Sequence, residues 1–281
     1  ISLFILVFRM VSLKYVEGDF LTSKGQSMLE TSRSIPAIRG SILDRNNFPL
    51  AVSINQYDLY ALKQFSKEDF EKLKDFLFFT KDFSDIKKLN KKNLIFSNLN
   101  FSQYENIKSL KISGIEIESF QKRYYPLGEQ VSTLVGFAGK DGFGLEGLEN
   151  ILDSELSGVS GREIIYRNAS RRPRITQEAI QGLDIKLTID SRVQFYAYKH
   201  LVSFVEANNA KGGSAIVLDN ISGEILAIAS YPSYNPNNPK RQITRNRALV
   251  DAFEPGSIIK PLALAKGLDM GIISKNQVVD T

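Results

Sequence analysis

Cysteine is absent from this 281-residue chain, and histidine occurs once, at position 200. The absence of cysteine excludes thiol catalysis, disulfide bonds and cysteine-ligated zinc. One histidine argues against a histidine-based catalytic triad and a histidine-rich metal site, so we interpret His200 as a half-exposed helix residue without a catalytic role. Any nucleophile therefore needs a lysine or a carboxylate as its base, and we expect no metal and no other cofactor.

The chain also lacks a long hydrophobic run. Its first residues, ISLFILVF, are mostly apolar but too few to span a bilayer, which takes about 20 helical residues. One interpretation is a buried helix or the remnant of a signal peptide. The interpretation that we favour is the outer end of a membrane helix whose beginning is missing, with Arg9 and Lys14 reaching the interface. We therefore expect a membrane anchor over 1–13 and a membrane-proximal linker over 14–33.

The composition is that of an ordinary globular protein, with 43% apolar and 24% charged residues, and the length predicts two domains. The net charge of +5 fits a nearby anionic surface as well as it fits nucleic acid. Four arginines lie close together in RNASRRPRI (167–175), but no aromatic stacking platform accompanies them. We interpret this run as a solvated linker face and expect no nucleic-acid partner.

Alternating apolar and polar residues predict strands in the first part of the chain. The segment 35–62 has this alternation and is broken by the turn-forming residues 44–47, which predicts two short strands. The stretch 114–128 predicts a strand that enters a turn. A glycine-rich block over 136–147 follows, and after it we expect a short helix.

Two further helices are indicated by residues that are typical of N-caps. Ser66 with Asp69 three positions later predicts a helix over 66–80. Asp190 or Ser191 begins another, whose apolar residues recur at helical spacing. Two strands joined by a turn at 220–223 predict a hairpin, and a last helix over 257–270 is expected to end at Gly271. The pattern is that of an α+β fold with an antiparallel sheet and helices.

The pattern Ser-x-x-Lys occurs three times, beginning at Ser84, Ser119 and Ser257. Ser84 lies in a charged surface stretch. Ser119 lies in a predicted strand, where an offset of three puts two side chains on opposite faces. Only Ser257 and Lys260, in FEPGSIIKP, stand at a predicted helix start, where the same offset puts them on one face.

That placement suits nucleophilic catalysis. A serine hydroxyl needs a base within hydrogen-bond reach, and a neutral lysine one turn along provides it. The helix N-terminus offers the backbone N–H of Ser257 to a developing oxyanion, and we expect Phe253 and Pro255 to exclude water. Pro261 deprives the Ser257 carbonyl of its helical partner, so we expect an irregular first turn. The alternative is a helix that merely begins with Gly-Ser and carries Lys260.

The residues 142–147 satisfy G-x-G-x-x-G, a dinucleotide-binding pattern. A phosphate loop needs positive potential, whereas this segment carries Asp141, Glu146 and Glu149. The surrounding elements also do not continue as a parallel βαβ unit. We therefore interpret these glycines as residues of tight backbone turns.

Five segments carry recognisable motifs: IPAIRGSILDRNNFPLA, RYYPLGEQVSTLVGFAGKDGFGLEGLE, LTIDSRVQ, SAIVLDNISGEILAIASYPSYNPN and NRALVDAFEPGSIIKP. Together they resemble the class B penicillin-binding proteins, and most closely the division-specific transpeptidase family (FtsI), over the whole chain. The first segment has Asn47 where the family usually has glycine.

The resemblance implies a β-rich non-catalytic pedestal of the dimerisation type over 34–180 and the first part of a β-lactamase-like transpeptidase domain over 184–281. It implies that Ser257 is the nucleophile that attacks the D-Ala-D-Ala end of a peptidoglycan stem peptide, that Lys260 is its general base, and that β-lactams trap the serine. Structural roles are implied for the remaining motif residues: Arg39, Asp44, Arg45 and Glu254. The first three of these are expected to form an ion-pair network.

By the same resemblance, the protein is expected to be a single-pass protein of the bacterial cytoplasmic membrane with its catalytic part in the periplasm. Its implied partners are the polytopic septal glycosyltransferase and other division proteins. The family also needs Ser-x-Asn and Lys-Ser/Thr-Gly motifs. No Lys-Ser-Gly or Lys-Thr-Gly occurs here, and Ser274-Lys275-Asn276 follows Ser257 too closely. We therefore expect a fragment. An elongation-specific relative and a catalytically inactive partner-binding scaffold are the alternatives.

Overall fold

The structure is a computed structural model that describes residues 8–9, 13, 30–62, 65–78, 83, 92–166, 174–239 and 245–278. Most of the expected anchor (1–13) and linker (14–33) lies outside these residues, as do Arg167, Arg171 and Arg172 of the basic run. Among the described residues, no helix is long and apolar enough to cross a bilayer.

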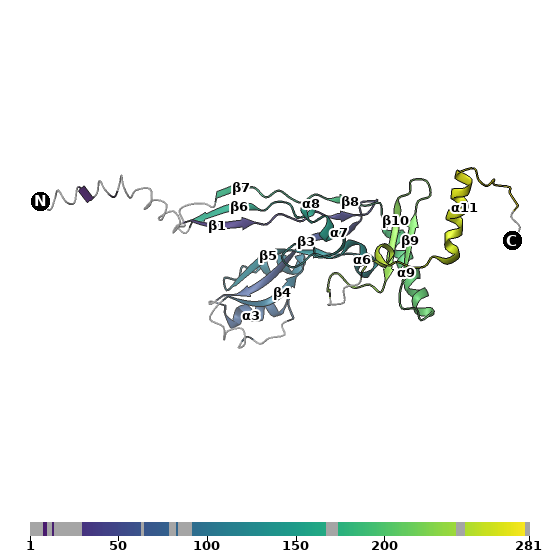
Figure 1. Cartoon of the computed structure of the whole chain (residues 1–281). Helices are drawn as coiled ribbons and strands as arrows, with labels where there is room; N and C mark the ends of the chain where they lie inside the picture. The colour runs from purple at the N-terminus through teal and green to yellow at the C-terminus, as the bar shows by residue number, and fades with distance from the viewer. Residues whose placement is uncertain are drawn as a thin grey trace.

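The molecule is elongated, with the sheets of the expected pedestal at one end and helix α11 near the other (Figure 1). One arm is an antiparallel sheet in the order β1 (Glu30–Ile35), β6 (Gly161–Tyr166) and β7 (Arg174–Gln177). Strand β6 returns along β1 from far along the sequence, pairing Ile35 with Gly161.

A second arm is built on β3 (Pro49–Ala61), which pairs along its length with β5 (Ile115–Tyr124) and at its far end with β4 (Asn93–Leu99). The helices α3 (Lys67–Lys74) and α5 (Phe101–Ser109) accompany this sheet. They contribute to a core whose buried members are Tyr57, Leu59, Ala61, Phe65, Phe70, Leu73, Leu77, Leu99 and Ile107. The expected cap is confirmed: Ser66 and Asp69 form a capping box, although the helix ends at Lys74.

The expected turn at 44–47 is present, but the strands beside it are unequal. Strand β2 (Ile42–Leu43) has 2 residues and β3 has 13. Strand β2 pairs antiparallel with β3 and parallel with β8 (Ile185–Lys186), so the chain closes a sheet across more than a hundred residues. The expected helix after the glycine block is two short helices, α7 (Gly147–Ile151) and α8 (Asp153–Ser157).

The last described hundred residues confirm the expected helix and hairpin. Helix α9 (Ser191–Ala207), capped by Asp190, packs against β9 (Gly213–Leu218) and β10 (Ile225–Tyr231). A second buried cluster combines residues of both halves of the chain: Ile42, Leu50, Ala51, Tyr125, Val131, Val135, Leu156, Ile189 and Ile228. The junction between the halves is therefore a shared hydrophobic core.

Four short elements and the last helix complete the arrangement around this core and after the hairpin. The 3-10 turn η1 (Gly128–Gln130) and helix α6 (Ser132–Val135) lie beside α9 and β10. Helix α10 (Arg247–Val250) then leads to the 3-10 turn η2 (Gly256–Ile259) and to α11 (Lys260–Asp269). The mixture of antiparallel sheets and helices confirms the α+β class.

Candidate active site

Ser257 lies in η2, and Lys260 begins α11, so the helix starts three residues later than expected. The cause is Pro261, which has no N–H for the Ser257 carbonyl. That carbonyl instead accepts the N–H of Lys260, closing the irregular first turn that the sequence predicts. Because residues three apart eclipse in a 3-10 turn, the two side chains lie on the same side. At the other end, Gly271 has a φ of 66°, as expected of a C-terminal glycine.

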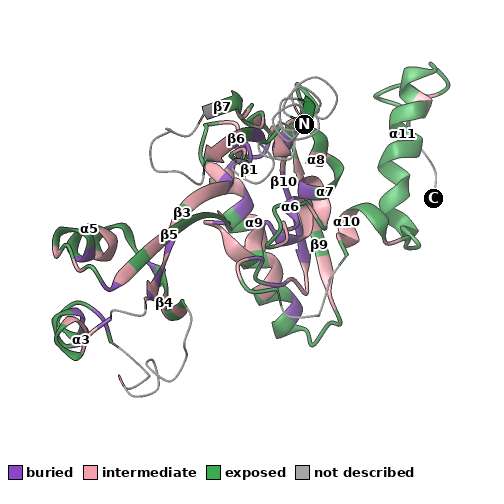
Figure 2. Cartoon of the chain, turned by 90° about the vertical axis from the view of Figure 1, so that its left-hand side faces the viewer, coloured by how far each residue is buried: buried purple, intermediate pink, exposed green. Residues whose placement is uncertain are grey.

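The surroundings of this pair are open. Ser257 and Lys260 are both exposed, and helix α11 stands clear of the sheets (Figure 2). Phe253, expected to exclude water, is 76% exposed. The described residues show no hydrogen bond between the side chains of Ser257 and Lys260, and Glu254 is exposed and forms no ion pair within them. The roles of these residues stay predictions.

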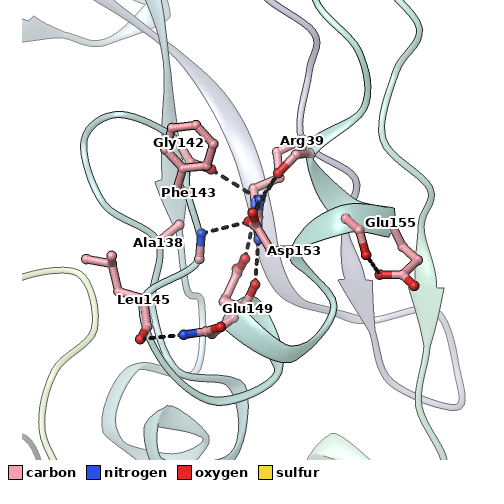
Figure 3. Close-up of polar contacts among 12 residues, drawn as sticks. Arg39, Ala138, Gly142, Phe143, Leu145, Glu149, Asp153 and Glu155 are labelled. Carbon is pink, nitrogen blue, oxygen red and sulfur yellow. Dashed lines mark hydrogen bonds and ion pairs between the residues drawn. The ribbon is translucent and has the colours of Figure 1, made fainter.

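Arg39, by contrast, lies at the centre of a buried ion-pair network (Figure 3). Its Nε lies 2.7 Å from Oε2 of Glu149, and its Nη1 lies 2.7 Å from Oδ1 of Asp153. Arg123 approaches the other oxygen of Glu149, also at 2.7 Å. Glu149 is completely buried, so the two guanidinium groups compensate for the cost of removing its charge from water.

The glycine-rich block supports this network through its backbone. The Gly142 carbonyl accepts a hydrogen bond from Arg39, and the Gly144 N–H donates to Asp153. Burial raises the pKa of Asp153, but these donors from Gly144 and Arg39 outweigh it and hold the pKa below its usual value. A Cβ on Gly144 would lie 1.9 Å from the Glu149 carbonyl oxygen, so only glycine fits. Close backbone packing therefore requires Gly144, while Gly142 and Gly147 have φ of 88° and 57°, as expected of residues in tight turns.

Asp44 does not pair with Arg39 or Arg45. Its buried carboxylate accepts the N–H groups of Asn46 and Phe48 within the turn, and that of Ser191 at the start of α9. Burial raises the pKa of Asp44, but these N–H donors hold it below its usual value. The expected ion-pair network of three residues is thus divided, and Asp44 instead joins the pedestal to α9.

Arg45 is the third member of that expected network, and it also reaches across the junction. Its guanidinium lies 3.4 Å from the carboxylate of Glu224, in a pair that is more than a third exposed at both ends. Its backbone N–H donates to the carbonyl of Ile189. The exposed ion pair contributes little to stability. The backbone contact, together with that of Asp44, holds the turn against the chain just before α9.

Gln194 is a further junction residue that the sequence did not indicate. Its side chain is fully buried and donates to the carbonyls of Gln130 and Ile228, while its oxygen accepts the Ile228 N–H. It thus ties η1, α9 and β10 together. The only signal in the sequence is a glutamine beside the apolar residues of α9.

The sequence also did not indicate the roles of Arg123, Glu149 and Asp153, because their partners are distant in sequence. Within the described residues, no group of acidic or histidine side chains is placed to hold a metal ion.

Comparison with known proteins decides the family. The penicillin-binding protein dimerisation domain matches residues 34–187, and the penicillin-binding protein transpeptidase domain matches 213–281. The chain belongs to the class B penicillin-binding proteins. It is 35% identical over 295 residues to the probable peptidoglycan D,D-transpeptidase PenA of Neisseria meningitidis, covering 98% of this chain and 50% of that protein.

Two other penicillin-binding proteins give the same result. The peptidoglycan D,D-transpeptidase FtsI of Escherichia coli K12 is 32% identical over 302 residues, covering 100% of this chain and 51% of that protein. The crystal structure of penicillin-binding protein 2X from Streptococcus thermophilus superposes with a TM-score of 0.69 at 27% identity, covering 88% of this chain and 43% of that one. The chain spans about half the length of the curated relatives that it matches.

Proposed function

We propose that this protein is a peptidoglycan D,D-transpeptidase that works through an acyl-enzyme on Ser257. The single observation that carries the proposal is that the transpeptidase match includes Ser257 and Lys260, in a chain whose relatives are named as such enzymes. The local backbone agrees with it, because the turn η2 brings a serine and a lysine to the same side of the start of α11.

In the proposed reaction, the Oγ of Ser257 attacks the carbonyl carbon of the penultimate D-alanine of a stem peptide. Lys260 takes the hydroxyl proton, and the amide bond to the terminal D-alanine breaks, with the proton passing to the leaving amine. The amine of a second stem peptide then attacks the ester, forms the crosslinking amide and releases Ser257. A β-lactam acylates the same serine because its ring amide takes the place of the donor amide.

We assign the activity to septal wall synthesis, in line with the FtsI relatives. We further propose a single-pass anchor in the bacterial cytoplasmic membrane, for which the apolar ISLFILVF followed by Arg9 is the support. On this proposal, the catalytic part lies on the periplasmic side and works beside the polytopic septal glycosyltransferase and other division proteins.

The test uses the protein encoded by the complete reading frame. The purified protein is incubated with uncrosslinked glycan strands that carry pentapeptide stems. It should release free D-alanine and form crosslinked dimers of the stem peptides, both detectable by mass spectrometry. Depleting it in cells should give filaments without septa. Round cells after depletion would instead indicate that the protein acts in cell elongation. Normal septation together with no D-alanine release would contradict the proposal, and filaments without any D-alanine release would favour the scaffold.

A further inference from the structure

Helix α10 precedes the turn that carries Ser257, and it packs on strands β9 and β10 of the hairpin (Figure 2). Ser230 of β10 is 1% exposed and attaches the start of α10 to the sheet. Its hydroxyl donates to the side chain of Asn246 at 3.1 Å and accepts the backbone N–H of Ala248 at 3.4 Å. A buried hydroxyl that uses both its donor and its acceptor in this way fixes its partners. The hairpin therefore defines where α10 begins.

Arg247, the first residue of α10, adds a second attachment. A Cβ added to Gly212 would lie 3.1 Å from Nε of Arg247, so the guanidinium packs directly on the backbone just before β9. The same Cβ would lie 2.6 Å from the carbonyl oxygen of Tyr231, the last residue of β10. A residue with a side chain does not fit between these two groups. Arg247 is thus seated where the two strands of the hairpin end.

Asp251, the C-cap of α10, receives two arginines. Its Oδ2 lies 2.9 Å from Nη1 of Arg247, and its Oδ1 pairs with Nε of Arg245. Its backbone N–H also donates to the carbonyl of Arg247 at 3.1 Å. The hydrogen bond from Arg245 is the main cause that holds the pKa of the Asp251 carboxyl below its usual value. One ionised carboxylate therefore ties the residue before α10, its first residue and its end together.

The chain turns toward the nucleophile at Asp251. This residue leaves the helix with an extended backbone, at a φ of −82° and a ψ of 119°. Ser257 follows six positions later, and Pro255 between them has a φ of −70°, which its ring restricts. The backbone angles of Asp251 thus set the direction in which the chain runs from the hairpin to Ser257.

We propose that Asp251 is a positioning residue for Ser257. Held by Arg245 and Arg247, it fixes the segment 251–257 relative to the hairpin and so places the serine hydroxyl for acylation. This inference rests on the proposed function, and it adds a residue that acts through the backbone without contact to the reacting atoms. A misplacement of about 1 Å at a reacting group can lower a rate about a hundredfold.

The same contacts contribute little to global stability. The side chains of Asp251 and Arg247 are 24% and 32% exposed, and that of Arg245 is 67% exposed. Ion pairs that water reaches in this way are weak contributors to the free energy of folding. A positioning role therefore predicts a variant that folds normally, binds penicillin normally and reacts slowly. A merely structural role predicts that all three properties change together.

The experiment measures acylation of the protein encoded by the complete reading frame, with a fluorescent penicillin over a range of concentrations. This range separates the affinity of the noncovalent complex from the rate of acylation within it. Asp251→Asn keeps the shape of the side chain but removes the charge that both guanidinium groups bind. We expect it to lower the acylation rate about tenfold or more and to leave the affinity nearly unchanged. Asp251→Glu keeps the carboxylate and should recover part of the rate.

Asp269→Asn is the matched control. It removes an exposed carboxylate on α11, paired with Lys266 at 3.5 Å, and should be acylated like the wild type. Thermal unfolding and amide hydrogen exchange are measured on the same variants. The unfolding midpoints should agree, while the amides of 251–257 should exchange faster in Asp251→Asn than in the wild type or the control.

An unchanged acylation rate in Asp251→Asn would overturn the proposal. A lower rate that comes with a weaker complex and a lower unfolding midpoint would overturn it as well, because loss of structure would then explain the rate. A wild type that is never acylated would remove the proposed function. The exchange measurement is separate from that outcome, and equal exchange over 251–257 in Asp251→Asn and the wild type would show that Asp251 does not hold this segment.

Discussion

Arg39 and Glu149 form an ion pair 110 residues apart in sequence, with Nε and Oε2 at 2.7 Å and side chains that are 7% and 0% exposed. Arg39 belongs to the opening motif of the pedestal, and Glu149 belongs to the helix after the glycine-rich block. Burial makes this pair sensitive to the loss of either partner, since the remaining buried charge then loses part of its compensation. Arg39 therefore joins the opening motif to the helix after the glycine-rich block through a buried ion pair.

Truncating Arg39 should destabilise the folded protein strongly. We expect Arg39→Ala to lower the free energy of unfolding by about 3–5 kcal/mol, because Glu149 would keep a buried charge with only Arg123 beside it. Denaturant unfolding followed by circular dichroism measures the change. Glu71→Ala is the control, because Glu71 pairs with Lys74 on the exposed face of α3 and should change stability little. Equal effects of the two substitutions would contradict the assignment.

Gln194 should contribute to stability through the three backbone groups that it satisfies. Gln194→Leu keeps much of the volume but leaves the Gln130 carbonyl and both polar groups of Ile228 without this partner. Each buried group left unsatisfied costs about 1–3 kcal/mol. Thermal unfolding should therefore show a clearly lower midpoint than for Gln121→Leu, a control on the exposed surface of β5. A Gln194→Leu midpoint equal to that of the control would show that the junction does not depend on this side chain.

Asp190 should make stability depend on pH in the acid range. Hydrogen bonds from the Arg192 guanidinium hold the pKa of the Asp190 carboxyl well below its usual range. A carboxyl with a lowered pKa in the folded state stabilises the fold above its unfolded pKa of about 3.9, and this stabilisation is lost as the pH falls below that value. We therefore expect the Asp190→Ala variant to be about 1 kcal/mol less stable than the wild type at pH 7, because it lacks the N-cap of α9. Below pH 4 the wild type loses the contribution of this carboxylate, so the difference in stability between the two proteins should shrink.

The control for this experiment is Ser66→Ala, which removes the N-cap of α3 without removing a titratable group. Its stability should be lower by a similar amount at every pH. Denaturation midpoints measured from pH 7 down to the acid limit of folding give the comparison. Identical pH profiles for Asp190→Ala and the wild type would contradict the account of the α9 cap.

Local features of this fold were predictable from the sequence because neighbouring residues determine them. The capping box at Ser66, the cap at Asp190, the hairpin turn and the end of the last helix at Gly271 all depend on contacts within a few positions. The irregular turn at Ser257 was also predictable, since Pro261 cannot donate a hydrogen bond.

Long-range contacts were not predictable in the same way. The hydrogen bond from Ser191 to Asp44 joins residues 147 apart, and nothing near Asp44 indicates its partner. The same is true of Glu149, which pairs with Arg39 in the loop after β1 and with Arg123 in β5. The family resemblance implied ion pairs among the charged residues of the opening motif, but burial and chain topology decide which charges meet.

Lys260 should be required for acylation but not for folding. Lys260→Arg keeps a positive charge and a long side chain but cannot supply a neutral base, since arginine does not lose its proton in proteins. The acylation rate of the full-length protein by a fluorescent penicillin should fall by orders of magnitude. Lys266→Arg, on the same helix and 68% exposed, is the matched control and should be acylated normally. Normal acylation of a folded Lys260→Arg variant would exclude Lys260 as the base.

The central claim is that Ser257 carries the acyl group. Trypsin should release it in a peptide covering 248–266, because Pro261 blocks cleavage after Lys260. Mass spectrometry of the full-length protein after reaction with benzylpenicillin should find the added mass on Ser257 in that peptide. It should find none in Ser257→Ala, and normal labelling in Ser119→Ala, which alters another Ser-x-x-Lys sequence. An adduct on a different residue, or labelling that survives in Ser257→Ala, would contradict the account.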